Sequence, residues 1–243
     1  MSTRAVTSAP SAGVLRWGGQ RARTGWWRGD PAVAYLAPAP GPPPSPEFVA
    51  RCLVALEGRG FSKVVTPALS PLEQTGFVAA GFEEHERLHL LGIRVDQGLD
   101  PLPSGAPLRR ARRRRRGAVL DIDGRAFSPF WQFDPSGLAE ALHATPSTWF
   151  RVALDGPVVI GYAICGRAGA QGYVQRLAVD PDHHGQGTGR RLLMDGLHWM
   201  RRRGVTQAVV NTQVGNHTAL ALYRRVGFRD EPSGLAVLYK DLA

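Results

Sequence analysis

The sequence contains only two cysteines, and their positions, Cys52 and Cys165, do not have the spacing of metal ligands. No apolar run approaches the roughly 20 residues that a membrane-spanning helix needs, and residues 1–10 contain no apolar core of a signal peptide. We therefore expect a cytoplasmic protein that binds neither a metal nor a membrane. Hydrophobic residues make up 43% of the chain, which is enough for a packed core.

Lysine is almost absent, occurring only at positions 63 and 240, so nearly all of the 30 basic residues are arginine. With 29 glycines and 19 prolines this usage is typical of a GC-rich genome, and the net charge of +10 does not by itself indicate a nucleic-acid partner. The charge is concentrated in the arginine run, residues 109–116, where all but one position is arginine. We interpret residues 97–117 as a flexible, like-charged linker. The alternative is a weak contact with a polyanion such as ribosomal RNA.

A glycine-rich segment follows an apolar strand predicted over residues 173–179. Three glycines lie at alternate positions, Gly185, Gly187 and Gly189, and an amphipathic helix is predicted to begin at Thr188. A chain that leaves a strand, turns on glycines and enters a helix directs several free N–H groups to one place, where the helix dipole adds partial positive charge. This segment, the glycine cradle of residues 185–190, is predicted to bind a phosphate or pyrophosphate.

Two common nucleotide-binding motifs do not fit the cradle. Its spacing is G-x-G-x-G rather than the G-x-G-x-x-G of dinucleotide-binding folds, and it lacks the lysine of a P-loop. The segment instead resembles motif A of the GCN5-related N-acetyltransferases, the GNAT superfamily. That motif reads [Arg/Gln]-x-x-Gly-x-[Gly/Ala], after a strand ending in apolar-x-Val-x-Pro. The matching residues are Leu177, Val179, Pro181, His184, Gly187 and Gly189, with His184 in place of arginine or glutamine.

Residues 211–228 resemble motif B of the same superfamily. Asn216 is the predicted N-cap of a helix, and Gly227 is its predicted end. Between them, apolar residues at positions 219, 222, 223 and 226 keep helical spacing, and Phe228 follows. Both motifs occur in the order and at the spacing of the family, and the resemblance covers roughly residues 117–243.

The resemblance implies an α/β (α+β) architecture, the GNAT fold, in which helices flank a mixed central sheet. It also implies acetyl-CoA as cosubstrate. The pyrophosphate would lie on the cradle, with Arg190 adding charge, and the pantetheine would pair with the backbone of Leu177 to Val179. The residues expected to bind acetyl-CoA are Leu177, Ala178, Val179, His184, Gly185, Gln186, Gly187, Thr188, Gly189, Arg190, Asn211, Asn216, Ala219 and Tyr223.

The same resemblance implies two catalytic groups. The backbone N–H near Leu177 would polarise the thioester carbonyl and stabilise the oxyanion. Tyr223 aligns with the family's general acid, which protonates the leaving thiolate. The general base is open, because Asn211 stands where the branch that acetylates protein N-termini has a glutamate. The candidates are an ordered water or one of the side chains of Asp121, Asp123, His183 and His184.

The acceptor implied is an amine: a protein N-terminus, a lysine or a small amine. Phe127, Phe130 and Trp131 lie in a segment that resembles the acceptor side of the N-terminal acetyltransferase branch, so they could line a groove. Cys165 lies on a strand that precedes the cradle, which favours direct attack in a ternary complex over an acetyl-enzyme. We predict an N-acetyltransferase. The alternative is a non-catalytic acyl-CoA-binding regulatory module, possibly associated with RNA or the ribosome through the arginine run.

Residues 1–96 are predicted to form a smaller unit that imperfectly repeats part of residues 118–243, the predicted catalytic domain. The corresponding pairs are Gly60 with Gly204, Ser70 with Asn216, Phe77 with Tyr223, Gly81 with Gly227, and Phe82 with Phe228. The smaller unit resembles a degenerate GNAT half in which a proline-rich loop at 38–46 replaces the cradle. Proline has no N–H to offer a phosphate, so we expect a structural pseudo-domain.

The spacing of hydrophobic residues and the positions of turn-forming residues predict the individual helices and strands. In the smaller unit we expect strands at 14–17, 32–36 and 64–65, a helix at 47–57 and a helical segment at 70–82. In the catalytic domain we expect strands at 118–121, 149–154, 158–165, 173–179, 207–212 and 235–240. The helices expected there are 122–131, 134–144, 188–203 and 216–226.

Overall fold

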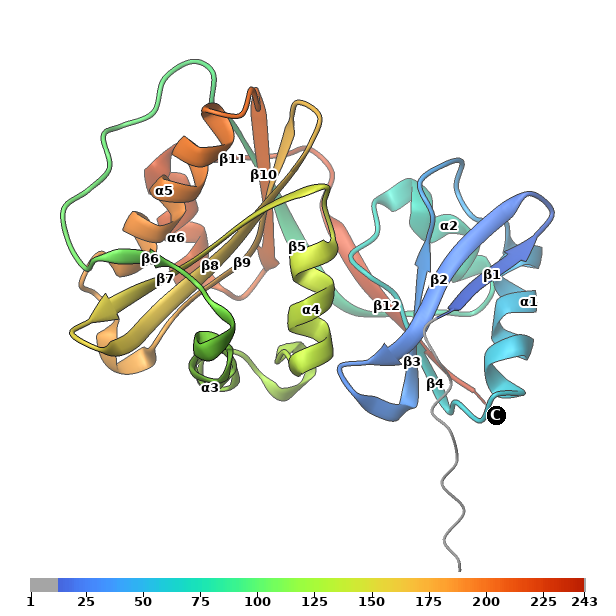
Figure 1. The fold of residues 1–243 in the computed structure, drawn as a ribbon. Helices are drawn as coiled ribbons and strands as arrows, with labels where there is room; N and C mark the ends of the chain where they lie inside the picture. The colour runs from blue at the N-terminus through green and yellow to red at the C-terminus, as the bar shows by residue number, and fades with distance from the viewer. Residues whose placement is uncertain (1–12, 243) are drawn as a thin grey trace, which may run out of the picture. The chain divides into compact units, whose positions relative to one another are not determined.

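A computed structural model describes residues 13–242 (Figure 1). Residues 1–12, which include the segment where no signal peptide was expected, lie outside this part, as does Ala243. The chain forms two compact units. Unit 1 contains the chain up to Leu88 and again from Ser233, and unit 2 runs from His89 to Pro232. Among the helices of residues 13–242, none is long and apolar enough to cross a membrane.

Unit 1 is a sheet with two helices, α1 (Pro46–Glu57) and α2 (Pro71–Ala79). Its strands in spatial order are β1 (Gly13–Trp17), β2 (Gln20–Trp27), β3 (Asp30–Pro38), β4 (Lys63–Val65), β12 (Leu235–Asp241) and the first part of β5 (Glu83–Arg94). Neighbours are antiparallel except β3 and β4, which are parallel and joined by α1. The predicted apolar face of α1 is confirmed, because Phe48, Cys52, Leu53 and Leu56 are buried in the core of this unit.

Unit 2 is a second sheet that continues from the later part of β5. Its remaining strands are β6 (Leu108–Arg110), β7 (Ser147–Asp155), β8 (Val158–Ala168), β9 (Gln171–Val179), β10 (Gln207–Gln213) and β11 (Arg229–Asp230). The spatial order is β5-β10-β9-β8-β7-β6, with β11 paired to β5. Strands β9 and β10 are parallel and the other printed pairs are antiparallel, so the predicted mixed sheet is confirmed.

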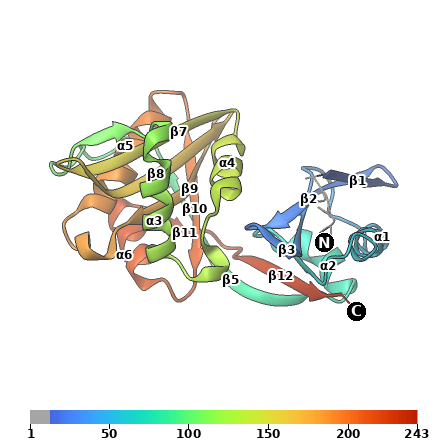
Figure 2. The same cartoon turned by 60° about the horizontal axis from the view of Figure 1, so that its bottom comes forward.

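Helices cover both faces of the unit 2 sheet. They are α3 (Arg116–Ala126), α4 (Pro135–His143), α5 (Thr188–Arg201) and α6 (His217–Val226). Successive residues of a strand point to opposite faces: Ala163 and Cys165 of β8 lie in the core cluster with α5 and α6, whereas Tyr162 and Ile164 lie in the cluster with α3 and α4. Figure 2 shows α3 crossing the sheet over β8. The result is a three-layer α/β/α arrangement.

The two units repeat one connection. In unit 1 the chain runs β3–α1–β4–α2–β5, and in unit 2 it runs β9–α5–β10–α6–β11, each time with the first two strands parallel. The pairing of Phe77 with Tyr223 and of Phe82 with Phe228 follows this order, because Phe77 lies on α2 and Tyr223 on α6. The repeat inferred from sequence is therefore a repeat of topology.

The chain divides between the units differently from the expected boundaries. The predicted strand at 235–240 forms, but as β12 it pairs with β4 and β5 inside unit 1 rather than with the strands of unit 2. The end of β5 instead joins β10 and β11 in unit 2. Each sheet thus takes in a strand from the far side of the sequence boundary, which periodicity along the chain does not reveal.

Residues 97–117 are folded rather than a flexible linker. Their first part lies along α5, where Arg191 Nε donates a hydrogen bond of 2.9 Å to the carbonyl of Ala106 and His198 Nε2 donates one of 2.9 Å to the carbonyl of Asp100. Their last part forms strand β6 and the start of α3. Composition suggested a linker, but these tertiary contacts satisfy the backbone of the segment.

The predicted strand at 118–121 is wrong, since these residues belong to α3. Val119, Ile122 and Asp123 are buried, a spacing that fits a helix. A four-residue apolar run does not distinguish a strand from a buried helical turn. The predicted helix at 122–131 ends at Ala126. Strands β2, β5, β6 and β11 were not predicted, although the alternation of Arg21, Ala22, Arg23 and Thr24 was a signal for β2.

Close backbone packing in unit 1 generates a prediction at Gly76 of α2. A Cβ added there would lie 1.9 Å from the carbonyl oxygen of Pro44, which is backbone and cannot rotate away. We expect Gly76→Ala to lower stability by about 1–3 kcal/mol, the usual cost of overpacking. Thermal melting monitored by circular dichroism measures it. Gly124→Ala in α3 is the control: nothing lies within 4 Å of its added Cβ, so the variant should be neutral or slightly stabilised.

Candidate functional site

Strands β9 and β10 part in the middle of the unit 2 sheet. Their parallel pairing covers only residues 171–174 with 207–210. At that point β9 contains a bulge: Ile164 pairs with Arg176 but Cys165 pairs with Val174, leaving Gln175 without an opposite residue. The remainder of β9, which includes Leu177, Ala178 and Val179, pairs with β8 but not with β10. The stretch expected to pair with pantetheine therefore has an open backbone edge.

The glycine cradle lies at the end of this parted strand. After β9 the chain makes a 3₁₀ turn at Pro181–His183, and Gly185 and Gly187 adopt positive φ of 75° and 78° before α5 begins at Thr188. Glycine is needed there, because other residues rarely adopt this conformation. Among residues 13–242, the backbone N–H groups of residues 185–190 have no acceptor. This is a concave set of donors at a helix N-terminus, the arrangement that binds anions.

Side chains hold the cradle in place. His184 Nε2 donates a hydrogen bond of 2.9 Å to the carbonyl of Val179, so the residue that departs from motif A ties the loop to the strand. Helix α5 buries Leu192, Leu193, Leu197 and Met200 as predicted. Arg190, expected to add charge to the cradle, places its Nη2 at 3.1 Å from Asp100 Oδ2. The charge of the Arg190 guanidinium is therefore partly offset by a carboxylate within the protein.

Helix α6 carries the motif B residues and packs against the core of the unit 2 sheet. Asn216 caps the helix as predicted, because its side-chain oxygen accepts a hydrogen bond of 3.1 Å from Ala219 N, and Gly227 ends it at φ 108°. The ring of Tyr223 is buried, with its centroid 5.7 Å from that of Phe228. Its hydroxyl has no hydrogen-bond partner in the part of the chain that the structure describes. Asn211, by contrast, is exposed on β10.

Burial raises the pKa of Tyr223 above its ordinary value near 10; the nearby Cys165 thiol raises it further, and the Arg176 guanidinium lowers it. The phenol is thus protonated at neutral pH and has a proton to give. Cys165 itself is fully buried beneath α5, where a Cβ on Gly196 would lie only 2.6 Å from its sulfur. Burial also raises the pKa of that thiol, which leaves it a poor nucleophile.

The acidic candidates for a general base are not free carboxylates beside the cradle. Asp123 is fully buried, and its oxygens accept two hydrogen bonds of 2.8 Å from Arg176, one of 2.6 Å from Phe133 N, and one from the Tyr162 hydroxyl. Asp121 is exposed on α3. His183 lies in the 3₁₀ turn after β9, with its Nδ1 buried and without a partner in residues 13–242.

Arg176, which the sequence interpretation missed, lies at the centre of the region around Phe127 that was expected to face the acceptor. It follows the β9 bulge, pairs with Asp123, and donates a hydrogen bond of 2.7 Å to the carbonyl of Trp131. Its guanidinium lies between two rings, 3.4 Å from the centroid of Phe127 and 4.1 Å from that of Phe133. The proposed groove aromatic Phe127 is therefore held against β9, whereas Phe130 and Trp131 pack edge to face with centroids 5.1 Å apart.

Arg125 of α3 connects this helix to the segment that directly precedes the cradle. Its guanidinium pairs with Asp180, which is buried at the end of β9, and with Asp182 at 3.2 Å. Helix α3, the aromatic segment after it and the cradle are thus joined by charge-assisted hydrogen bonds. Within residues 13–242, no group of three His, Cys, Asp or Glu side chains is placed to hold a metal ion.

Comparison with known proteins gives a family match over the same region. The sequence model of the "Acetyltransferase (GNAT) family" matches residues 117–228. N-alpha-acetyltransferase 30 of Schizosaccharomyces pombe is 35% identical over 92 residues, 36% of this chain and 61% of that protein. Mycothiol acetyltransferase of Clavibacter michiganensis subsp. michiganensis is 36% identical over 110 residues, 45% of this chain and 32% of that protein. The chain thus spans less than two thirds of either relative.

The fold is similar to that of a solved tandem GNAT protein from the clavulanic acid biosynthesis pathway. The TM-score is 0.69 over 96% of this chain and 84% of that one, at 13% identity. An identity this low supports a common fold and nothing more specific. The likeness extends over both units, in agreement with their repeated topology.

The buried ion pair generates a prediction. Arg176→Met removes the partner of Asp123 and leaves a carboxylate with no exposed surface uncompensated, which typically costs about 3–5 kcal/mol. We expect a loss of this order in urea denaturation. Arg176→Lys keeps the charge but not the two-pronged geometry, so its loss should be smaller. Equal stability of wild type and Arg176→Met would show that the pair does not hold this region together.

Proposed function

Residues 117–228 belong to the acetyltransferase (GNAT) family, and on this premise we propose that the protein is an acetyl-CoA-dependent N-acetyltransferase. The acetyl group passes directly from the thioester to an amine in a ternary complex. The observation that supports this most strongly is the combination of an open cradle of N–H groups with a parted β9 edge immediately before it. The first suits a pyrophosphate, and the second suits an extended chain of amides.

Acetyl-CoA would lie along this line. Its pyrophosphate would take the N–H groups of residues 185–190, with Arg190 contributing once it exchanges Asp100 for phosphate. The pantetheine amides would pair with the backbone of Leu177, Ala178 and Val179. Thr188 and Gly189 open α5 behind the phosphates, while Asn211, Asn216 and Ala219 border the cofactor from β10 and α6. A fixed dipole near Leu177 would stabilise the oxyanion without reorganisation.

Tyr223 would protonate the thiolate of CoA as it leaves. Its raised pKa keeps the proton on the phenol until the thiolate, a stronger base than the neutral thioester, develops. The attacking amine must lose a proton, and the sequestered carboxylate of Asp123 does not suit that role. We infer that an ordered water takes the proton and passes it to solvent, with His183, whose Nδ1 has no partner in residues 13–242, as a candidate relay.

The acceptor is proposed to approach between the parted strands and the aromatic segment of Phe127, Phe130 and Trp131, which Arg176 holds in place. The similarity to an N-alpha-acetyltransferase supports a protein N-terminus as acceptor, and the similarity to mycothiol acetyltransferases supports a small amine. A screen of peptides and small amines, scored by CoA release, decides between them. No release with any acceptor, despite tight acetyl-CoA binding, would favour a non-catalytic acyl-CoA-binding module.

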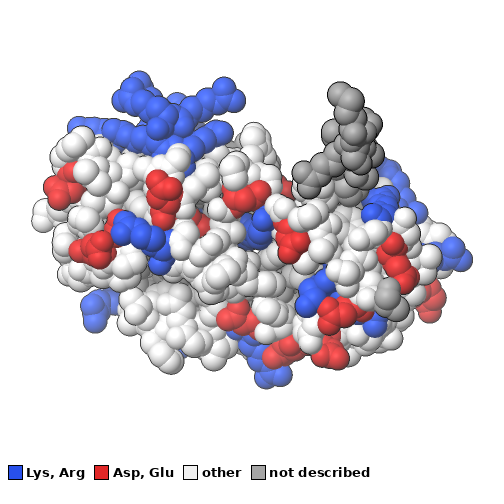
Figure 3. All heavy atoms as spheres, turned by 90° about the horizontal axis from the view of Figure 1, so that it is seen from below, with Lys and Arg blue, Asp and Glu red and all other residues white. Residues whose placement is uncertain are grey.

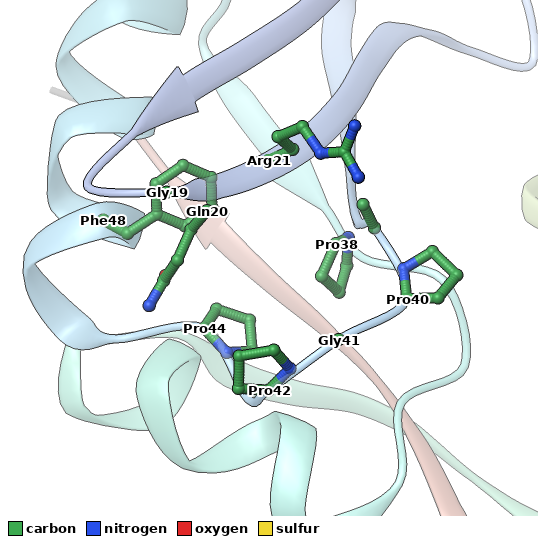
Figure 4. Close-up of a pocket in the computed structure, with 10 residues that line it drawn as sticks. Gly19, Gln20, Arg21, Pro38, Pro40, Gly41, Pro42, Pro44 and Phe48 are labelled. Atoms are coloured by element: carbon green, nitrogen blue, oxygen red, sulfur yellow. The ribbon is translucent and has the colours of Figure 1, made fainter.

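Unit 1 is proposed to bind no acetyl-CoA, because its turn from β3 to α1 differs from the corresponding turn from β9 to α5 in unit 2. The N-terminus of α1 is already satisfied: Ser45 Oγ accepts from Phe48 N at 3.2 Å, and Pro46 has no N–H to offer. The loop before it forms a pocket lined by proline rings (Figure 4), together with Gln20 and Arg21. The side-chain oxygen of Gln20 accepts a hydrogen bond of 2.9 Å from Ser45 N. An apolar proline pocket does not compensate a pyrophosphate.

The cradle is tested by Gly187→Asp. The side chain would occupy the anion's approach and its charge would repel pyrophosphate, so we expect acetyl-CoA affinity to fall on the order of 100-fold in calorimetry. Gly204→Asp is the matched control, because Gly204 also has a positive φ, 77° against 78°, and nothing near its added Cβ. Equal affinity in both variants would contradict the assignment of the cradle.

The proton donor is tested by Tyr223→Phe, which keeps the ring and removes the hydroxyl. We expect kcat to fall on the order of 100-fold, with acetyl-CoA affinity nearly unchanged. Because burial raises the pKa of Tyr223, the wild-type rate should not decline through its deprotonation below about pH 10. Tyr239→Phe, in β12 of unit 1, controls for loss of a hydroxyl. An unaffected kcat, with chemistry rate-limiting, would exclude the role.

The stoichiometry distinguishes one site from two. Calorimetric titration should give one acetyl-CoA per chain, because within residues 13–242 the cradle of unit 2 has N–H groups without an acceptor, whereas Ser45 and Pro46 close the corresponding turn of unit 1. A crystal soaked with CoA should show density along β9 and the cradle. Two equivalents, or density beside the proline loop at 38–44, would contradict the pseudo-domain interpretation of unit 1.

A further inference from the structure

We propose that the arginine run, residues 109–116, is a binding surface for the phosphate backbone of a nucleic acid, separate from the acetyl-transfer site. Figure 3 shows Lys and Arg side chains gathered densely at one edge of the surface, at the upper left. The run supplies seven of the ten net positive charges of the chain. The proposal does not depend on acetyl transfer, and its test uses no acetyl-CoA.

The backbone of the run is folded, so the positions from which its side chains extend are fixed. Arg109 and Arg110 lie on β6, opposite Val152 and Arg151 of β7. Ala111 N donates a hydrogen bond of 3.1 Å to the carbonyl of Phe150. The chain then makes a 3₁₀ turn at Arg113–Arg115 and enters α3. A partner therefore meets a preformed surface rather than a tail that must be ordered on binding.

The charges of the run are not neutralised inside the protein. In the described part of the chain none of its arginines forms an ion pair, and no Asp or Glu occurs between Asp100 and Asp121. Arginines elsewhere do find carboxylates, in the pairs Arg87–Glu84, Arg94–Asp96, Arg125–Asp180, Arg176–Asp123, Arg190–Asp100 and Arg224–Asp230. Single unpaired arginines also occur elsewhere, but seven within eight consecutive positions with no carboxylate nearby in sequence occur in this run.

The number of like charges exceeds what a sheet edge needs. Strand β6 lies at the end of the unit 2 sheet, and one or two charges are enough to prevent edge-to-edge pairing. Here Arg110 also stands directly opposite Arg151, a destabilising like-charge pair. Within residues 13–242 the ion-pair partner of Arg151 is Asp195, at 4.0 Å. An anionic partner would reduce this repulsion further than screening by solvent does.

The surface fits phosphate better than a folded protein. Protein interfaces have an apolar centre, but Leu108, directly before the run, and Ala111, inside it, pack inward against core clusters of unit 2. Among the described residues, no exposed large hydrophobic lies between Leu102 and Val158. Guanidinium groups bind phosphate oxygens in pairs of parallel hydrogen bonds. We therefore choose the repeated phosphates of a nucleic acid over an acidic protein.

The test compares two triple variants with equal loss of charge. In the first, Arg112, Arg113 and Arg114 become Gln. In the second, Arg16, Arg59 and Arg202 become Gln; these are exposed arginines outside the run with no ion pair in the described structure. Binding of a fluorescein-labelled 20-base-pair DNA duplex and of a 20-nucleotide RNA is measured by anisotropy from 50 to 200 mM salt. Circular dichroism melting establishes that both variants are folded.

For the duplex, the logarithm of the wild-type affinity should fall linearly with that of the salt concentration, and the run variant should reduce this slope by about 2–3. Its affinity at 50 mM salt should fall by about 10- to 100-fold, while the control variant changes less than about threefold. Equal losses in the two variants would overturn the proposal in favour of bulk charge. The proposal would also be overturned if the wild type bound neither the duplex nor the RNA, even if it bound phosphatidylserine vesicles.

Discussion

The fully buried carboxylate of Asp123 sets the arrangement of α3, β8 and β9 in unit 2, because its charge has to be compensated without water. Arg176 of β9 approaches it with two hydrogen bonds, Tyr162 of β8 adds a hydroxyl, and the backbone of Phe133 closes the set. Breaking any one contact leaves a buried charge short of a partner. Helix α3, the segment after it and two central strands are thereby held as one body, with Phe127 against the guanidinium.

The proposed acetyl-CoA site depends on backbone N–H groups, those of the cradle, that are left without a hydrogen-bond partner in the described structure. Helix α5 is anchored by its apolar face, and the N–H groups at its N-terminus have no partner in the part of the chain that the structure describes. In unit 1 the same strand–helix–strand connection is closed by Ser45 and by prolines. Since the topology is shared, what separates a candidate binding site from a structural repeat is the chemistry of about six residues between strand and helix.

Unit 1 is completed by a strand from the far end of the chain. Strand β12 completes unit 1 after the chain has built unit 2, and β5 contributes to both sheets. Unit 1 is therefore built from two separate stretches of sequence, whereas unit 2 is one continuous stretch. This makes long-range strand pairing part of the folding of unit 1.

The sequence by itself determined the parts governed by local chemistry. The glycine spacing, the Asn216 cap, the apolar faces of α1 and α5 and the repeated motif order follow from residue type and period, and the mixed α/β fold follows from them. Tertiary structure alone decided what depends on distant residues. Residues 118–121 became helix because Val119, Ile122 and Asp123 face the sheet, and residues 97–107 became ordered because Arg191 and His198 bind their carbonyls. Strand β12 moved to unit 1, and Arg176 met Asp123, because strand pairing and charge burial act between segments that no local pattern connects.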